Sequence, residues 1–277
     1  TAGIYDVVIN EIMADPLPAV SLPGNEWIEL KNTTGFTINL LGWRIADDAG
    51  TSGPLPNYFL RADSFVIVCT GSAVAALSAY GPVLSVTSFP SLNDAGENLT
   101  LQNQNGIAIH NVNYSSNWYQ NELKKNGGWT LEMIDSKNPC NGANNWKASN
   151  DARGGTPAQK NSIAANNPDT KAPAILYAYA IDPLHLQLMF NEGLAQTSAQ
   201  QISAYNISNG IGLPISAVTV APQYNSVLLT LNAPLQVGTI YSIVVTNITD
   251  CSGNNLSSGT TRLSLTQSIN AFDVVVN

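Results

Sequence analysis

Charged residues are scarce in this sequence. Asp, Glu, Lys and Arg make up only 11% of the 277 residues, and acidic residues outnumber basic ones 19 to 11. A net charge of −8 repels a phosphate backbone, and the nearest approach to a basic patch is the single pair Lys124-Lys125. We therefore expect no nucleic-acid partner.

Long apolar runs are also missing. No stretch approaches the roughly 20 residues that a membrane-spanning helix needs, so membrane insertion is not expected. The first residues, 1–5, lack the basic and apolar parts of an export signal, and we expect any such signal to have been removed. Low charge with abundant Asn, Ser, Thr and Gly is typical of an extracellular or cell-surface β-protein.

Cysteine and histidine are too few for a structural zinc site, which would need nearly all three cysteines and both histidines. Cys69 ends an apolar run and is expected to be a buried thiol in a strand. If a disulfide forms, we favour Cys69 with Cys140, because both lie in the same predicted domain. Cys251, in a predicted turn, would then be left over.

The sequence offers no arrangement for catalysis. It has no nucleophile elbow, His185 alternates with leucines and should face solvent, and His110 is expected to be a partly packed strand residue. Glu26 and Glu29 are three residues apart, so on one strand they face opposite sides and cannot flank one bond. We expect the few ionisable side chains to lie on solvated rims and turns, and the chain not to be an enzyme.

Alternation with a period of two dominates the first half. Residues 9–13 and 27–31 are predicted to be strands with one buried face, and 64–69 a more fully buried strand. Asn105-Gly106 separates two alternating runs and predicts a hairpin, because both residues tolerate positive φ. Only residues 71–80 have a helical pattern.

Turn and breaker residues between about 154 and 173 indicate a domain boundary, and about seven short strands follow. The predicted fold class is therefore all-β, with two immunoglobulin-like β-sandwich domains in tandem. The segment 273–277 (DVVVN) repeats the pattern of 6–10 (DVVIN), which suggests another copy of the first domain. The predicted organisation is a sandwich at 1–162, a linker at 163–172, a sandwich at 173–269 and the start of a further repeat at 270–277.

An ordered series of motifs in the first half resembles the lamin tail domain, an immunoglobulin-like sandwich that is also common in bacterial surface proteins. The resemblance covers about residues 6–162. Its motifs are residues 9–12, 26–32, 41–45, 60–67, 96–101, 128–132 and 154–157.

The second half is similar to the immunoglobulin-like domain of bacterial S-layer and other surface proteins. The motifs are Ala172-Pro173, residues 190–192, residues 205–207, Tyr241 and residues 247–254. Neither family implies a reaction. The resemblance implies a structural, spacer or interaction module whose partners are other domains of the same protein or other surface proteins.

Calcium is the one cofactor that we consider, because loops rich in Asp and Asn supply the oxygen ligands that it needs. Two sets of residues are candidates: Asp15, Glu26 and Asp48 around the first loops, and Asp169, Asp250 and Asn254 near the linker and the last turn. The resemblance to S-layer proteins implies a candidate ion site at the second set, because some of those relatives hold ions there. Neither set matches an EF-hand, and metal-free Asp/Asn turns are the alternative.

Four aromatic residues lie in one loop-rich segment: Trp118, Tyr119, Trp129 and Trp146. Exposed, they would form a platform for polysaccharide, as in an accessory module of a larger extracellular enzyme. Alternatively, they pack the loops against the sandwich. We favour packing, because large aromatic side chains are mostly buried.

Overall fold

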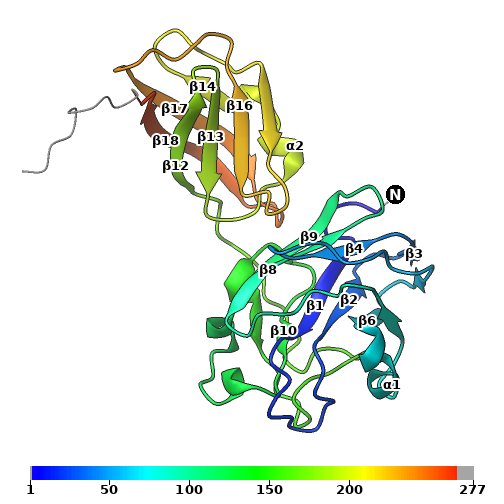
Figure 1. Ribbon diagram of the computed structural model, residues 1–277. Coiled ribbons are helices and arrows are strands. Elements are labelled where there is room, and N and C mark those ends of the chain that lie inside the picture. Colours follow the sequence, from blue (N-terminus) through cyan, green and yellow to red (C-terminus); the bar gives the residue numbers. More distant parts are fainter. Residues whose placement is uncertain (1, 267–277) are drawn as a thin grey trace, which may run out of the picture. The chain divides into compact units, whose positions relative to one another are not determined.

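The computed structural model describes residues 2–266 and divides into two compact units after Pro168 (Figure 1). Unit 1 is residues 2–168 and unit 2 is residues 169–266. The predicted further repeat at 270–277 lies outside the described residues. Both units consist of β-sheets with only single turns of helix, which confirms the predicted all-β class.

Unit 1 is built on a six-stranded sheet in the order β11-β10-β1-β2-β6-β7. All neighbouring strands are antiparallel except β6 and β7, which are parallel. The strands are β1 (Val7–Met13), β2 (Trp27–Asn32), β6 (Phe65–Cys69), β7 (Val83–Ser85), β10 (Leu131–Met133) and β11 (Trp146–Ala148).

A second, three-stranded sheet in the order β4-β8-β9 lies over one face of the first (Figure 1). The predicted hairpin is its β8–β9 pair, and Gly106 in the turn has a φ of +76°. Its strands are β4 (Arg44–Ala46), β8 (Gly96–Gln102) and β9 (Ala108–Ser115). Unit 1 also contains a two-stranded pair, β3 (Ile38–Asn39) and β5 (Phe59–Leu60), and one turn of α-helix, α1 (Val74–Leu77). Four 3-10 turns complete it, at Gly71–Ala73, Ser116–Tyr119, Lys124–Asn126 and Gly142–Asn145.

Both faces of the six-stranded sheet are covered, so every residue of β1 is buried. One face packs aliphatic side chains such as Ile12, Ile28 and Leu30 into the main core shared with the second sheet. The other face packs Trp27 and Cys69 against α1. The sequence predicted one buried face for β1 and β2, and that prediction is wrong because a later segment covers the polar side.

A row of three glutamates occupies this second face. Glu11 on β1 lies opposite Glu132 on β10 and opposite Glu29 on β2, and all three side chains have no exposed surface. We call Glu132, Glu11 and Glu29 the glutamate row. The expectation that acidic side chains lie on solvated rims is therefore wrong for these residues.

The cover is residues 154–163, which we call the clamp. Its backbone N–H groups donate to one carboxylate after another: Thr156 to Glu11 at 2.7 Å, Ala158 to Glu29 at 2.5 Å and Ile163 to Glu132 at 3.1 Å. The hydroxyls of Thr130, Thr156 and Ser162 and the amide of Asn10 add further donors. Buried carboxylates persist only where such donors replace water, so the row and the clamp depend on each other.

Gly155 shows how tightly the clamp approaches the sheet. A Cβ at this position would lie 2.8 Å from Glu11 Oε1 and 2.7 Å from Thr130 Cγ2. No side chain fits there without moving the clamp away from its acceptors.

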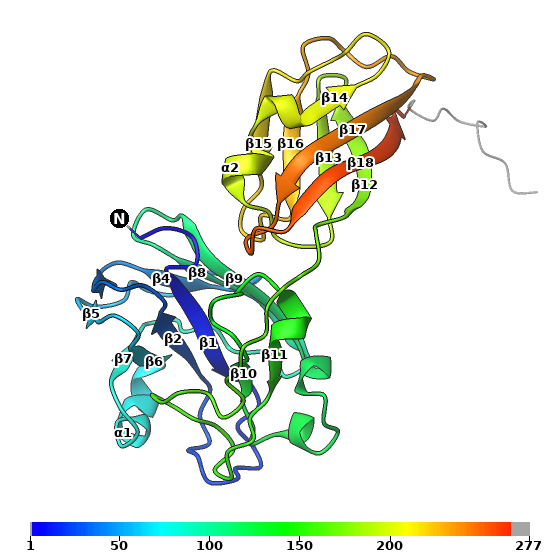
Figure 2. The same ribbon diagram turned by 180° about the vertical axis from the view of Figure 1, so that it is seen from behind.

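Unit 2 is a sandwich of two antiparallel sheets with the orders β12-β13-β16-β15 and β14-β17-β18, which pack face to face (Figure 2). Leu188, Phe190 and Leu229 from the first sheet and Tyr205 and Ile243 from the second meet in its core. Its elements are β12 (Ile175–Asp182), β13 (His185–Phe190), α2 (Gln196–Ala199), a 3-10 turn at Ile202–Ala204, β14 (Tyr205–Ile207), β15 (Ser216–Thr219), β16 (Ser226–Thr230), β17 (Ile240–Thr249) and β18 (Asn255–Ser264).

The glutamate row makes the stability of unit 1 depend on pH. Burial and the neighbouring carboxylates raise the pKa of Glu11 well above its usual value, and burial raises the pKa of Glu29 to about 8. Because both pKa values are raised in the folded state, the stabilisation is complete below the unfolded pKa, near 4.5, and is lost as the pH rises through about 8.

We predict that Glu11→Gln weakens this dependence. Glu11 Oε1 accepts both hydrogen bonds while Oε2 has no partner among the described residues, so a glutamine amide keeps the acceptor and removes the charge. In urea unfolding, the variant should be more stable than the wild type at pH 9 by about 1 kcal/mol or more, and within about 0.5 kcal/mol of it at pH 5. The control is Glu122→Gln, at an exposed position. An equal loss of stability with pH in all three proteins would contradict the prediction.

Candidate metal centre

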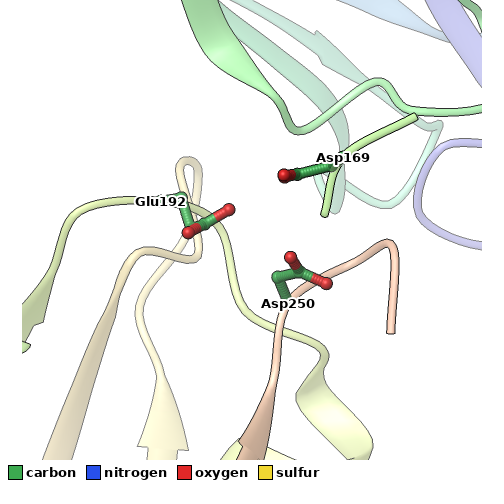
Figure 3. A group of neighbouring side chains, drawn as sticks. All are labelled: Asp169, Glu192 and Asp250. Carbon is green, nitrogen blue, oxygen red and sulfur yellow. The ribbon is translucent and has the colours of Figure 1, made fainter. Parts of the chain in front are cut away.

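Three acidic side chains of unit 2 converge at one end of the sandwich (Figure 3). Asp169 precedes the first strand, Glu192 follows β13 and Asp250 follows β17. One carboxylate oxygen from each lies within 4.8 Å of the others, and no second set of three Asp, Glu, His or Cys side chains in residues 2–266 meets this distance. We call these three residues the acidic cluster.

A turn fixes the position of Asp250, which is almost completely buried. Its Oδ1 accepts the backbone N–H groups of Ser252 and Asn254, each at 2.8 Å, and its Oδ2 accepts the Asn254 side-chain amide at 2.8 Å. The same amide group donates to the backbone carbonyl of Asp169 at 3.2 Å. The structure thus brings the predicted residues Asp169, Asp250 and Asn254 together, with Asn254 joining the other two.

One carboxylate oxygen of Asp169 accepts no hydrogen bond from the described residues. Its Oδ1 accepts the N–H of Lys171 at 3.0 Å, whereas its Oδ2 is buried and has no hydrogen-bond partner within the described range. Burial, followed by the charges of Asp169 and Asp250, raises the pKa of Glu192 to about 7. Three carboxylates with one orphaned oxygen can be satisfied by a shared proton or by a cation.

The comparisons with known proteins assign each half of the chain. A model of the lamin tail domain matches residues 1–116, and a model of the bacterial Ig-like domain matches residues 134–267. The chain joins a lamin tail domain to a bacterial Ig-like domain. The second match begins inside unit 1, where β10 and β11 belong to the sheet of the lamin tail domain, and the structural boundary lies after Pro168.

No curated protein matches the sequence. Among solved structures, the N-terminal part of the bacterial S-layer protein SbsC is 18% identical over 36% of this chain and 24% of that chain, with a TM-score of 0.33. A longer form of the same S-layer protein is 17% identical over 36% of this chain and 14% of that chain, also with a TM-score of 0.33. The chain spans less than a quarter of the length of those S-layer proteins.

The other predicted calcium residues do not come together in the lamin tail domain. Asp15 accepts the N–H of Leu17 within its own turn, and Glu26 accepts the N–H of Leu92 at 3.0 Å. Asp48 forms no three-residue group with them. Conversely, the sequence did not reveal Glu192 as a member of the acidic cluster, since only the packing of two distant loops places it there.

The predicted aromatic platform is packed into the lamin tail domain. Trp146 and Tyr119 are buried, and Trp118 and Trp129 are half-buried. The Trp118 ring lies 6.2 Å from that of Trp146, and Lys124 Nζ lies 4.3 Å from the Trp129 ring centre. The packing alternative is therefore correct, and these four side chains do not form an exposed surface.

The predicted disulfide between Cys69 and Cys140 is wrong. Cys69 is a free thiol packed beside Trp27 and Leu77, and burial raises its pKa to about 11. Cys140 is engaged in a disulfide, but not with Cys69. Membership of the same predicted domain suggested the wrong pair, because β6 directs the Cys69 side chain into a core cluster that contains no other cysteine.

Neither histidine is placed for acid–base catalysis. His110 is buried, its Nδ1 accepts the N–H of Ile9 at 2.9 Å, and burial lowers its pKa to about 4. It is thus more deeply packed than the sequence predicted. His185 pairs with Asp182, with Nδ1 and Oδ2 2.8 Å apart, on the surface of the Ig-like domain.

Proposed function

We propose that the chain is a non-catalytic structural or spacer module of a secreted or cell-surface bacterial protein, and that its partners are other domains of that protein or other surface proteins. Both matched families are immunoglobulin-like domains and neither is an enzyme family. No helix among the described residues is long and apolar enough to cross a membrane.

The burial of the glutamate row supports this proposal most directly. Glu11, Glu29 and Glu132 are the carboxylates with the most unusual surroundings in unit 1, and such groups are the usual candidates for acid–base work. Here the clamp covers them completely and donates one backbone N–H group to each carboxylate. A substrate could reach them only if the clamp left the sheet, so they serve the fold.

A replacement experiment tests the proposal in the protein that carries this chain. A spacer can be exchanged for two unrelated β-sandwich domains of similar length, and we expect surface display and the activity of the remaining protein to be retained. Deletion without replacement is the control and should impair them. Loss of activity after replacement, with display intact, would show that specific residues of the chain are needed and would sink the spacer role.

We further propose that the acidic cluster binds Ca²⁺ in the Ig-like domain. Calcium takes carboxylate and carbonyl oxygens in flexible arrangements, which suits side chains that come from three separate loops. The buried Oδ2 of Asp169 accepts no hydrogen bond from an N–H group of the described residues, and either a proton shared with Glu192 or a cation would satisfy it. A bound ion would tie the first residues of the domain to the loops after β13 and β17.

Calcium should therefore raise the unfolding temperature of the Ig-like domain. Saturation to about ten times the dissociation constant adds roughly 1.4 kcal/mol, or several degrees for a domain of this size. Differential scanning calorimetry in calcium and in EDTA measures the shift, which Asp169→Asn and Glu192→Gln should abolish. Asp48→Asn, outside the cluster, should leave it unchanged. A shift that survives both cluster variants would place any bound calcium elsewhere.

A second candidate function is polysaccharide binding. It is favoured by two exposed tyrosines that are not among the four aromatic residues predicted from the sequence. Tyr177 and Tyr179 are exposed on the outer face of β12, with ring centres 6.3 Å apart. Tyr179 donates its hydroxyl to Gln187 Oε1 at 2.9 Å, and Gln187 lies opposite it on β13. Exposed aromatic rings beside an uncharged amide side chain suit the binding of a neutral glycan.

Affinity electrophoresis in gels that contain neutral β-glucan or xylan tests this candidate. Retardation should weaken at least about fivefold in Tyr177→Ala/Tyr179→Ala, because truncating a central aromatic contact costs ~1 kcal/mol or more. Phe59→Ala, an exposed aromatic on the lamin tail domain, is the control and should migrate like the wild type. Unretarded migration of the wild-type chain in every gel would remove this candidate.

A further inference from the structure

The lamin tail domain contains a cavity of about 460 Å³ that is separate from the acidic cluster. It lies beside β1 and β2, between the loop that follows β10 and the end of the clamp. The size falls within the range of small-molecule sites in proteins. Its lining includes Asn10, Lys31, Phe65, Lys137, Lys160 and Asn161.

Positive charge gathers at this cavity in a chain that is otherwise acidic. Lys31, Lys137 and Lys160 are three of the 11 basic residues in a protein of net charge −8. Lys31 Nζ is held by Asp63 at 3.1 Å and Ser136 Oγ at 3.2 Å, above the Phe65 ring. The ammonium groups of Lys137 and Lys160 make no ion pair with any residue of the described chain.

The two carboxylates at the cavity are already engaged. Asp63 pairs with Lys31. Asp135 accepts the backbone N–H groups of Lys137 and Asn167, each at 3.0 Å, and the side-chain amide of Asn138. The neutral donors on Asp135 leave its negative charge in place, and Lys31 and Asp63 offset each other, so the ammonium groups of Lys137 and Lys160 leave the cavity with a net positive charge of one.

The floor of the cavity is polar and rigid. Asn10 and Asn161 are both more than nine-tenths buried. The Asn10 amide donates to Glu29 Oε1 at 3.0 Å and to Asn161 Oδ1 at 2.7 Å, and the Asn161 amide donates to the carbonyls of Asn10 and Met133. The glutamate row thus fixes the floor, and the Asn10 side-chain carbonyl, which accepts no hydrogen bond from the described chain, is left to meet a donor on a ligand.

We propose that this cavity binds an anionic sugar residue of monosaccharide size, such as an acidic unit of a cell-surface glycan. The anionic group lies against Lys137 and Lys160, where charge-assisted hydrogen bonds form. Sugar hydroxyls meet the Asn10 carbonyl and the Ser136 hydroxyl, and Phe65 supplies an apolar face. This site goes beyond the spacer role and does not depend on calcium or on the tyrosine pair.

Nuclear magnetic resonance titration of the full chain tests the proposal with three matched probes: galacturonate, galactose 6-phosphate and galactose. At least one anionic sugar should shift the backbone amide signals of residues 134–137 and 160–166 and bind about tenfold or more tightly than galactose, because a charge-assisted hydrogen bond is worth ~1.5 kcal/mol or more. The two anionic probes distinguish a carboxylate ligand from a phosphate ligand, and binding of either supports the site.

Lys137→Ala/Lys160→Ala should weaken binding about tenfold or more, whereas Lys147→Ala, an exposed lysine of β11 outside the cavity, should not change it. Any of three results would overturn the proposal: no binding of either anionic sugar, equal affinity for galactose, or unchanged affinity in the double variant. Competition by sodium sulfate at the same concentration as the sugar would also overturn it, since it would show attraction to any anion.

Discussion

Three carboxylates without access to water hold the lamin tail domain together. Glu132, Glu11 and Glu29 lie on adjacent strands, and the clamp exists as an ordered segment because its backbone N–H groups find acceptors there. Without the clamp, these side chains would face solvent on an open sheet. Without the carboxylates, the clamp would lose partners for its buried donors. The same row fixes Asn10 and Asn161, so the cavity beside it takes its shape from this contact.

The fold could be predicted because most of its signals are local. The alternating residues of β1 and β2, the apolar run of β6 and the Asn105-Gly106 turn specify strands and a hairpin regardless of what lies elsewhere. The burial of Glu11 and Glu29 could not be predicted in this way. Their cover arrives about 130 to 145 residues later in the chain, and a strand with alternating Glu looks the same whether solvent or a clamp faces it.

In the candidate metal centre, too, residues that are close in sequence could be predicted together, whereas a residue from a distant loop could not. Asp250 and Asn254 belong to one turn, so the sequence identified them together. Glu192 comes from another loop, and nothing near it in sequence indicates a partner. The aromatic residues and Cys69 follow this pattern too. Their apolar side chains predicted correctly that they pack into the domain. Which cysteine forms a disulfide depends instead on where the strands direct the side chains, and this could not be predicted.

The glutamate row and the acidic cluster each bring three carboxylates close together, and the repulsion between them is reduced in different ways. In the glutamate row, every carboxylate accepts hydrogen bonds from the protein, although Glu11 Oε2 has no partner among the described residues, and burial raises the pKa values of Glu11 and Glu29, which favours their neutral forms. In the acidic cluster, turn donors satisfy Asp250, while one Asp169 oxygen is left without a donor beside Glu192. The clamp covers the row, so a change in the protonation of these carboxylates is coupled to the contact between the clamp and the sheet. The acidic cluster lies on loops at the end of a sandwich, where a bound cation would replace a shared proton, and this is why calcium is proposed for the Ig-like domain and not for the glutamate row.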